Sequence, residues 1–278
     1  MKICHLHRLC NLVINYLKFF PVLIFFLLIA CQTVPITGRQ QLNLVSSDTV
    51  LGMSDSEYRD FLSKHKLITN TPEAQMVQKV GQNIQHSVEV FFAQNNLSER
   101  LKGYRWEFNL VEDKSINAWC MPGGKVVVYT GILPVAKDDA GLAVVVGHEI
   151  AHAVAQHGDE RMSQGLLAQM GGVALATALS SKPKETNQLF MAAYGIGTQV
   201  GVLMPYSRLQ ESEADRLGLI FMAMAGYNPR AAVDFWKRMA AKKEGASLPE
   251  FLSTHPADET RIRNLEKLIP EAMQYYKS

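Results

Sequence analysis

Hydrophobic residues recur at helical spacing in the first part of the chain. Residues 72–93 carry an apolar stripe, preceded by Thr71 as a hydroxyl N-cap and by Pro72 at the first helical position. A shorter helix is expected over residues 46–65, capped by a serine. The stripe consists of Met76, Val77, Val80, Ile84, Val88 and Phe91. The pattern therefore predicts two N-terminal helices within residues 46–94.

From Trp106 onward, apolar residues alternate with polar ones, which predicts a half-buried strand. Two further β-rich runs, residues 117–121 and 125–129, are separated by Pro122-Gly123-Gly124, which favours a turn. We therefore expect a small antiparallel sheet with a hairpin that leads directly into the next helix.

That next helix is predicted from Asp138 to about residue 164, and its apolar run over 142–146 indicates burial. Two later stretches, 166–179 and 189–204, are apolar and rich in small residues. They predict closely packed helices or a mobile flap, and a membrane-dipping hairpin is the less favoured alternative. Further helices are expected over residues 206–218 and 229–242.

A buried helix with two histidines four residues apart is the most informative feature of the chain. His148 and His152 project from the same helical face, which is the spacing that two nitrogen ligands of one Zn²⁺ need. Glu149 lies on the flank of that face, where it reaches a metal-bound water and serves as general base. The alternative is an ordinary helix whose histidines are satisfied by neighbouring groups. His157 falls on the opposite side of a continuous helix and is assigned a structural role.

An acidic cluster about sixty residues downstream supplies a candidate third ligand. Glu211 and Asp215 are four residues apart and share a helical face, whereas Glu213 points away from it. Glu211 is predicted to bind the zinc, and Asp215 to accept the second ring N–H of a ligand histidine. A solvated acidic face is the alternative.

His255 precedes Pro256 at the start of the last helix and has three interpretations. It donates a hydrogen bond to the tetrahedral intermediate, it occupies the open zinc position as a silencing fourth ligand, or it makes only local contacts.

Residues 117–121 have two interpretations as well. Asn117, Ala118, Trp119, Cys120 and Met121 form an edge strand that binds a substrate peptide by strand addition, or a purely structural hairpin.

The N-terminal 30 residues combine three basic residues, no acidic residue and a short apolar run, as in a secretory signal. The run ends in Ala30-Cys31, which resembles a bacterial lipoprotein processing site, so Cys31 is the expected lipidation site. Gln32 after the cysteine favours the outer membrane by the same resemblance, and an uncleaved anchor is the alternative. Residues 31–45 are expected to form an extended tether.

Charge and cysteine usage exclude some classes of function. The whole chain has 28 basic and 26 acidic residues, so without the three basic residues of the leader it has 25 and 26. There is no basic run typical of nucleic-acid binding. Of the four cysteines, only Cys120 remains beyond Cys31, so no internal disulfide is available.

Together these motifs resemble the HtpX-like and CAAX-prenyl-protease-like gluzincin metallopeptidases, in particular a periplasmic lipoprotein branch. The resemblance covers roughly residues 31–268. It implies zinc held by His148, His152 and Glu211, with Glu149 as base and proton carrier, Asp215 behind a ligand histidine, His255 beside the metal, and substrate on the strand near residues 117–124. The motifs are His148-Glu149-Ile150-Ala151-His152, Glu211-Ser212-Glu213-Ala214-Asp215, Asn117 to Gly124, Ser253-Thr254-His255-Pro256 and Cys31 to Arg39. Trp119-Cys120 departs from the smaller or aliphatic pair often found there.

We therefore expect a mainly α-helical α+β, zincin-like fold with a small antiparallel sheet or hairpin beside the zinc helix. One domain over residues 46–278, with a catalytic core at 100–268, follows the signal (1–30) and the tether. The expected function is a Zn²⁺ endopeptidase, lipid-anchored at the periplasmic face of the outer membrane, that cleaves misfolded or misassembled envelope proteins beside an envelope assembly machinery. The alternatives are a chaperone or assembly factor that keeps the zinc fold to bind clients, and a peptidase silenced by His255.

Overall fold

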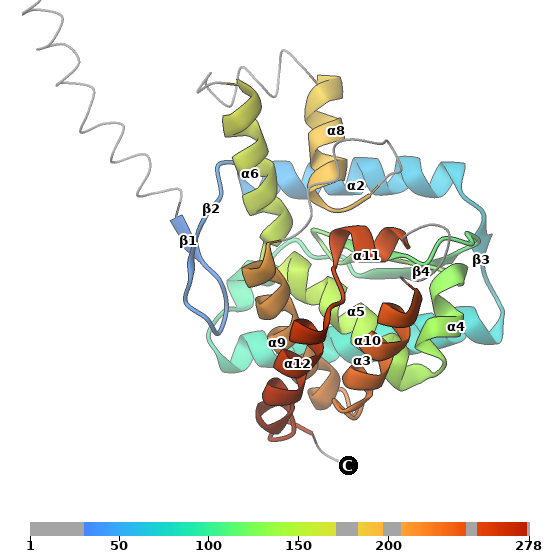
Figure 1. The fold of residues 1–278 in the computed structure, drawn as a ribbon. Helices are drawn as coiled ribbons and strands as arrows, with labels where there is room; N and C mark the ends of the chain where they lie inside the picture. The colour runs from blue at the N-terminus through green and yellow to red at the C-terminus, as the bar shows by residue number, and fades with distance from the viewer. Residues whose placement is uncertain (1–30, 171–182, 197–206, 243–248, 277–278) are drawn as a thin grey trace, which may run out of the picture.

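The computed structural model describes residues 31–170, 183–196, 207–242 and 249–276, which form helices around a four-stranded sheet, with a separate two-stranded hairpin (Figure 1). The strands are β1 (Cys31–Thr33), β2 (Gln40–Leu42), β3 (Leu67–Ile68), β4 (Glu107–Val111), β5 (Ala118–Met121) and β6 (Lys125–Tyr129). The α-helices are α2 (Ser47–Lys64), α3 (Pro72–Gln94), α4 (Leu133–Ala136), α5 (Asp139–Val154), α6 (His157–Met170), α8 (Pro183–Ala193), α9 (Arg208–Met224), α10 (Ala231–Ala241), α11 (Glu250–Thr254) and α12 (Glu259–Ala272). The predicted mainly helical α+β class is confirmed.

The main sheet is mixed and has the strand order β3-β4-β6-β5. The β5–β6 hairpin is antiparallel as predicted, with Ala118 opposite Val128. However, β4 runs parallel to β6, with Glu107 opposite Lys125, so the prediction of a wholly antiparallel sheet is wrong. After β4 the chain crosses to the far edge before it turns, and β6 then returns between β4 and β5.

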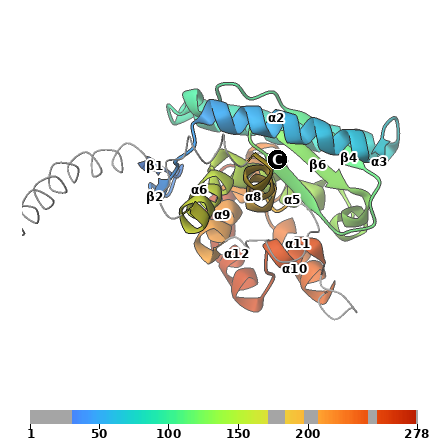
Figure 2. The ribbon, with the colours of Figure 1, turned by 90° about the horizontal axis from the view of Figure 1, so that it is seen from above.

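The two faces of the sheet pack against different helices, as strand alternation requires. In Figures 1 and 2, α2 lies across one face, while α5 and α3 lie on the other side. Trp119, Met121, Val127 and Val111 pack with Tyr58 and Phe61 of α2. Ala118, Cys120, Val126, Val128 and Leu110 belong to the larger core with α3, α5 and α9. The core therefore holds the hairpin rigidly beside α5.

Helices α5 and α9 approach each other so closely that an added Cβ at their crossing would make unusually tight contacts with backbone. A Cβ atom on Gly218 would lie 3.0 Å from the backbone N of His148 and 3.0 Å from the carbonyl carbon of Gly147. A Cβ on Gly147 would lie 3.1 Å from the carbonyl oxygen of Gly218. This contact brings the first turn of α9 beside the two histidines of α5.

The predicted long helix after Asp138 is broken. Asp138 caps α5 through the backbone N–H of Gly141. The helix then ends at Val154, and Gln156 adopts a left-handed φ of 60° before α6 begins at His157. The expectation that a continuous helix places His157 on the far side is therefore wrong, because the break turns the chain back toward His152.

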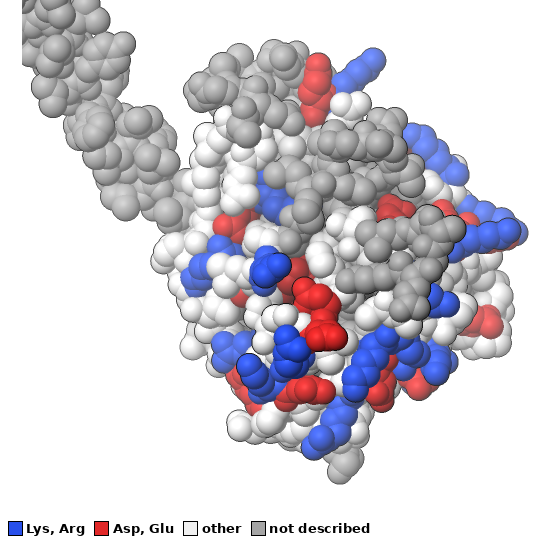
Figure 3. Space-filling view, in the orientation of Figure 1, with Lys and Arg blue, Asp and Glu red and all other residues white. Residues whose placement is uncertain are grey.

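Parts of the two predicted apolar stretches lie outside the described residues, namely 171–179 and 197–204. The described helix α8 packs against α6 and α2, and α6 and α8 extend side by side from the body (Figure 1). Among the described helices, none combines the length and the apolar character needed to cross a bilayer. Basic and acidic side chains are intermingled on the face seen in Figure 3.

Residues 31–45, expected to be an extended tether, are folded against the body. Strands β1 and β2 pair antiparallel, and Val34 and Gln41 are buried. The amide of Gln41 donates to the carbonyl oxygen of Ala155 at the end of α5. The burial of Val34 and the hydrogen bond of Gln41 stabilise the folded segment. They outweigh the loss of conformational entropy that ordering these residues costs.

We predict that Gly218→Ala lowers stability by about 1–3 kcal/mol, because the added methyl group meets backbone atoms that have no free rotation. It should also weaken zinc binding, since α9 carries Glu211. Denaturant unfolding with and without a chelator measures both effects. The control is Gly52→Ala on α2, where nothing lies within 4 Å of the added Cβ; equal effects of the two variants would contradict the prediction.

Candidate metal centre

Two histidines of α5 turn their rings toward one point. His148 Nε2 and His152 Nε2 lie 3.0 Å apart, and both side chains are buried. Residues one turn apart share a helical face, so this convergence follows directly from their spacing.

Helix α9 brings a carboxylate to the same point. Glu211 lies in its first turn, which is fixed by a capping box between Ser207 and Gln210 and is favourable for an acidic side chain. Glu211 Oε1 is 3.2 Å from His152 Nε2, and Glu211 Oε2 is 3.6 Å from His148 Nε2. Two helices that are distant in sequence thus supply three donor atoms.

A fourth donor comes from the end of α11. His255 Nδ1 lies 2.8 Å from Glu211 Oε1 and 3.2 Å from His148 Nε2, and the ring is buried. Each of the four residues His148, His152, Glu211 and His255 offers a ligand atom within 4.8 Å of the others.

The Nδ1 atoms of His148 and His152 each contact a neighbouring side chain, so the Nε2 atoms of the two rings are left to bind a metal. His148 Nδ1 is 3.1 Å from Asp215 Oδ1, and His152 Nδ1 is 2.9 Å from His157 Nδ1. The closest of these contacts is 2.8 Å, between His255 Nδ1 and Glu211 Oε1, and His148 Nε2 lies 3.6 Å from Glu211 Oε2; all four ligand atoms lie within 4.8 Å of one another. The edge of a tetrahedron with zinc–ligand bonds of about 2 Å is roughly 3.3 Å. The donor set therefore fits a zinc ion in both chemistry and size.

The electrostatics of the group also favour a cation. Burial alone would raise the pKa of Glu211, but His255 and Arg261 hold it well below its usual range. Burial likewise works to lower the pKa of His148, yet Asp215 and Glu211 hold it at about 9. These carboxylates create a buried negative field that a divalent ion balances.

The carboxylate of Glu149 lies beside the four donor atoms. Its Oε1 atom is buried and, within the described part of the chain, accepts no hydrogen bond; His255 Nε2 is 3.4 Å away. Burial raises the pKa of Glu149, although His255 and His148 oppose the shift. A carboxylate of raised pKa suits a base that takes and returns a proton. Burial and nearby Glu149 raise the pKa of the Cys120 thiol, which argues against a thiolate nucleophile.

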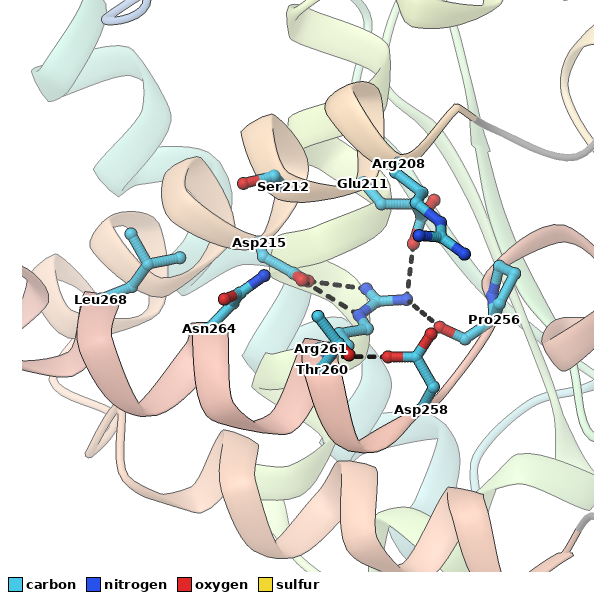
Figure 4. A pocket seen from close by; sticks show the side chains of 10 residues that line it. All are labelled: Arg208, Glu211, Ser212, Asp215, Pro256, Asp258, Thr260, Arg261, Asn264 and Leu268. Atoms are coloured by element: carbon cyan, nitrogen blue, oxygen red, sulfur yellow. Dashed lines mark hydrogen bonds and ion pairs between the residues drawn. The ribbon is translucent and has the colours of Figure 1, made fainter.

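Sequence reasoning missed Arg261 on α12. Figure 4 shows its guanidinium between Glu211 and Asp215. It donates to both oxygens of Asp215, at 2.6 and 3.0 Å, contacts Glu211 Oε2 at 2.5 Å and covers the ring of Trp236 at 3.5 Å. Its position one turn before Leu265 on the buried stripe of α12 was the available signal, because an arginine there needs buried anionic partners.

The sequence of this site matches a known family. The model of peptidase family M48 matches residues 78–269, which is more than half of the chain. The chain belongs to peptidase family M48. This M48 chain is a zinc metalloendopeptidase, and the predicted zinc cofactor, enzyme class and polypeptide substrate are confirmed.

Relatives of this M48 peptidase carry two kinds of name. It is 34% identical to mitochondrial metalloendopeptidase OMA1 of Schizosaccharomyces pombe, over 87% of this chain and 67% of the relative. It is 33% identical to the OMA1 metalloendopeptidase of Bos taurus, over 86% of this chain and 46% of the relative. A putative beta-barrel assembly-enhancing protease of Vibrio cholerae is 33% identical over 56% of this chain and 33% of its own length. These names differ from the HtpX-like and CAAX-prenyl-protease-like branches expected from the motifs.

We predict that Arg261→Met destabilises the metal-free protein by about 3–5 kcal/mol, because it leaves two buried carboxylates without their cation. Zinc should reduce the loss, since the ion supplies positive charge to the same carboxylates. Thermal and denaturant unfolding, with chelator and with zinc, measure the difference. Arg216→Met is the control; its half-exposed pair with Glu271 should contribute less than about 1 kcal/mol. The prediction is wrong if the two variants lose equal stability.

Proposed function

We propose that this zinc endopeptidase binds its metal through His148, His152 and Glu211 and uses Glu149 as general base. The observation that carries the proposal is the convergence of buried donor atoms beside Oε1 of Glu149, which accepts no hydrogen bond from the described residues. Asp215 and Arg261 hold the imidazole of His148 and the carboxylate of Glu211 in place.

The proposed reaction is hydrolysis of a peptide bond. Zinc, when bound, lowers the pKa of a water molecule and polarises the scissile carbonyl. Glu149 accepts the proton of the attacking water and returns it to the leaving amine. Because Glu149 follows His148 directly on a buried helix, its carboxylate is held in reach of the site without reorganisation.

We propose that the substrate binds as an added strand on β5, along residues 117–121. The location of β5 at the edge of the sheet supports this proposal, and no described strand pairs with its outer side. The side-chain nitrogen of Asn117 is also buried without a hydrogen-bond partner in the described residues, so it is available to a peptide carbonyl.

We further propose that the protein is anchored to the periplasmic face of the outer membrane by lipid on Cys31, and that its clients are misfolded or misassembled envelope proteins. The support for the anchor is the basic and apolar leader before Cys31. The support for the clients, and for an assembly machinery as partner, is the likeness to relatives named beta-barrel assembly-enhancing proteases. The larger group of relatives is named as mitochondrial, so fractionation of cells is the direct test of location.

We predict that Glu149→Gln lowers casein cleavage by at least about a hundredfold while zinc stays bound, because the amide keeps the shape of the side chain but cannot accept the proton. Metal analysis and proteolysis on the purified full-length protein measure both. Glu112→Gln is the control, since this residue lies on the surface and pairs with Lys66. Cleavage that survives Glu149→Gln would contradict the mechanism, and equal rescue of a deletion strain by both proteins would favour the chaperone alternative.

We also propose that His255 silences the resting enzyme as a fourth ligand. Its Nδ1 atom, close to both Glu211 and His148, supports this role over a purely local one.

We predict that His255→Ala raises casein cleavage several-fold, because removal of the ring leaves one position of the site to water. Initial rates at saturating zinc measure the effect, and His86→Ala on the exposed side of α3 is the control. An unchanged rate would contradict the silencing role, and a lost rate would instead favour the interpretation in which His255 stabilises the tetrahedral intermediate.

A further inference from the structure

The turn between β1 and β2 directs two side chains toward carboxylates of the helices beside it. The backbone N–H of Val34 donates to the carbonyl of Arg39, and that of Gly38 donates to the carbonyl of Val34. Gly38 adopts a left-handed φ of 66°, which glycine accommodates without strain. Val34 is buried in the main core, so the turn is anchored. Thr37 and Arg39, on either side of Gly38, therefore point to fixed partners.

Those partners are carboxylates on two different helices. Arg39 donates through Nε to both oxygens of Glu213 at 3.0 and 3.1 Å, and through Nη2 to Oε2 at 3.0 Å. Its Nη1 and Nη2 atoms bind the two oxygens of Glu160 at 2.8 and 2.9 Å. The Thr37 hydroxyl donates to Glu213 Oε1 at 2.8 Å. Glu213 is thus held by three donor atoms of the N-terminal turn and cannot rotate freely.

From Glu213 the contacts lead to a candidate zinc ligand. Glu213 Oε2 lies 3.1 Å from His157 Nε2, and His157 Nδ1 lies 2.9 Å from His152 Nδ1. With His152 presenting Nε2 to the metal, its Nδ1 carries the proton and donates to His157 Nδ1. His157 then carries its own proton on Nε2 and donates it to Glu213. His152 and His157 each have one tautomer that is compatible with these contacts, and the fixed carboxylate of Glu213 selects it.

The other ligand histidine has the same kind of support. His148 Nδ1 contacts Asp215, and Asp215 is held by Arg261. Each ligand imidazole is therefore supported by a carboxylate of α9, which is in turn bound by an arginine. The imidazole of His148 contacts its carboxylate directly, whereas that of His152 does so through His157. The guanidinium behind His148 belongs to α12, whereas the one behind His152 belongs to the N-terminal hairpin.

We propose that Thr37 and Arg39 are positioning residues for the zinc ligand His152, acting through Glu213 and His157. Docking of residues 31–45 is then part of what holds the metal. The inference rests on the proposed role of His152 as a ligand. A clamp that merely anchors the hairpin would affect stability but would leave zinc affinity and ligand geometry unchanged.

The test is zinc affinity, measured by chelator competition on the purified full-length protein. Arg39→Gln should raise the zinc dissociation constant about ten- to a hundredfold, as expected when an outer partner of a ligand is removed. Arg39→Lys should recover only part of the affinity, because an ammonium cannot bind both carboxylates in the bidentate geometry. Arg216→Gln is the matched control: its guanidinium binds Glu271 from the same helix as Glu213, and its removal should change the constant less than about twofold.

The second readout is the visible spectrum of the Co²⁺-substituted protein, which reports ligand geometry independently of activity. Arg39→Gln should change this spectrum, and Arg216→Gln should not. Thr37→Val, which removes one hydrogen bond and keeps the side-chain volume, decides the question if Arg39→Gln does not fold; it should raise the zinc constant about two- to tenfold. In a His157→Phe background, Arg39→Gln or Thr37→Val should raise the zinc dissociation constant by less than about a further twofold. The reason is that the contacts from Glu213 through His157 to His152 are already absent there.

Unchanged zinc affinity and Co²⁺ spectrum in every folded variant, or full additivity with His157→Phe, would overturn the positioning role. That result is separable from failure of the proposed function. A wild-type protein without stoichiometric zinc would refute the metal centre itself, whereas a wild-type protein with zinc and an indifferent Arg39→Gln would refute only this inference.

Discussion

The close approach of α5 and α9 is the constraint on which the rest of the structure depends. Gly147 immediately precedes His148, and Gly218 lies two turns after Glu211, so the glycine contact sets the distance between the two ligand-bearing helices. An added Cβ at either position would meet backbone of the other helix at 3.0 to 3.1 Å and would have to push it away by a few tenths of an ångström. A shift of that size approaches the tolerance of about 0.5 Å within which a site must be held. The sheet, α3 and α10 pack around this pair and keep it buried.

Bringing these helices together buries an unusual number of acids. Glu149, Glu211, Glu213 and Asp215 are all largely inaccessible, and burial opposes their ionised forms. Arg261 compensates Glu211 and Asp215. Against the effect of burial, His157, Arg39 and Thr37 lower the pKa of Glu213 to about 2. The arginines leave the negative field of the donor group only partly balanced. Metal binding and folding are therefore coupled, because the ion completes the neutralisation of the core.

The sequence predicted local geometry and the grouping of Glu211 and Asp215 with the histidines, but it missed other contacts between distant segments. Spacing within one helix placed His148 and His152 together, since helical periodicity is independent of the surroundings. The break at Gln156 was missed, because glutamine carries no preference for the left-handed region, and His157 was consequently assigned to the wrong side. The position of β6 between β4 and β5 is a matter of topology that strand patterns do not encode. The burial of Arg261 could be expected from its position on the buried stripe of α12, but the carboxylates that Arg261 and Arg39 bind could not, because sequence periodicity does not encode long-range charge pairs.

Helix α9 connects these elements because it contributes to the surroundings of every candidate ligand. Glu211 is itself a candidate ligand, Asp215 contacts His148, and Glu213 contacts His157 and through it His152. A displacement of α9 would therefore disturb the inner carboxylate and both outer carboxylates at the same time. Individual contacts of this kind are worth only a few kcal/mol, but contacts that share one rigid helix are lost or kept together. The candidate metal centre is consequently either formed or lost as a unit. Whether it forms depends on the elements that fix α9, namely the glycine contact, α12 and the N-terminal hairpin.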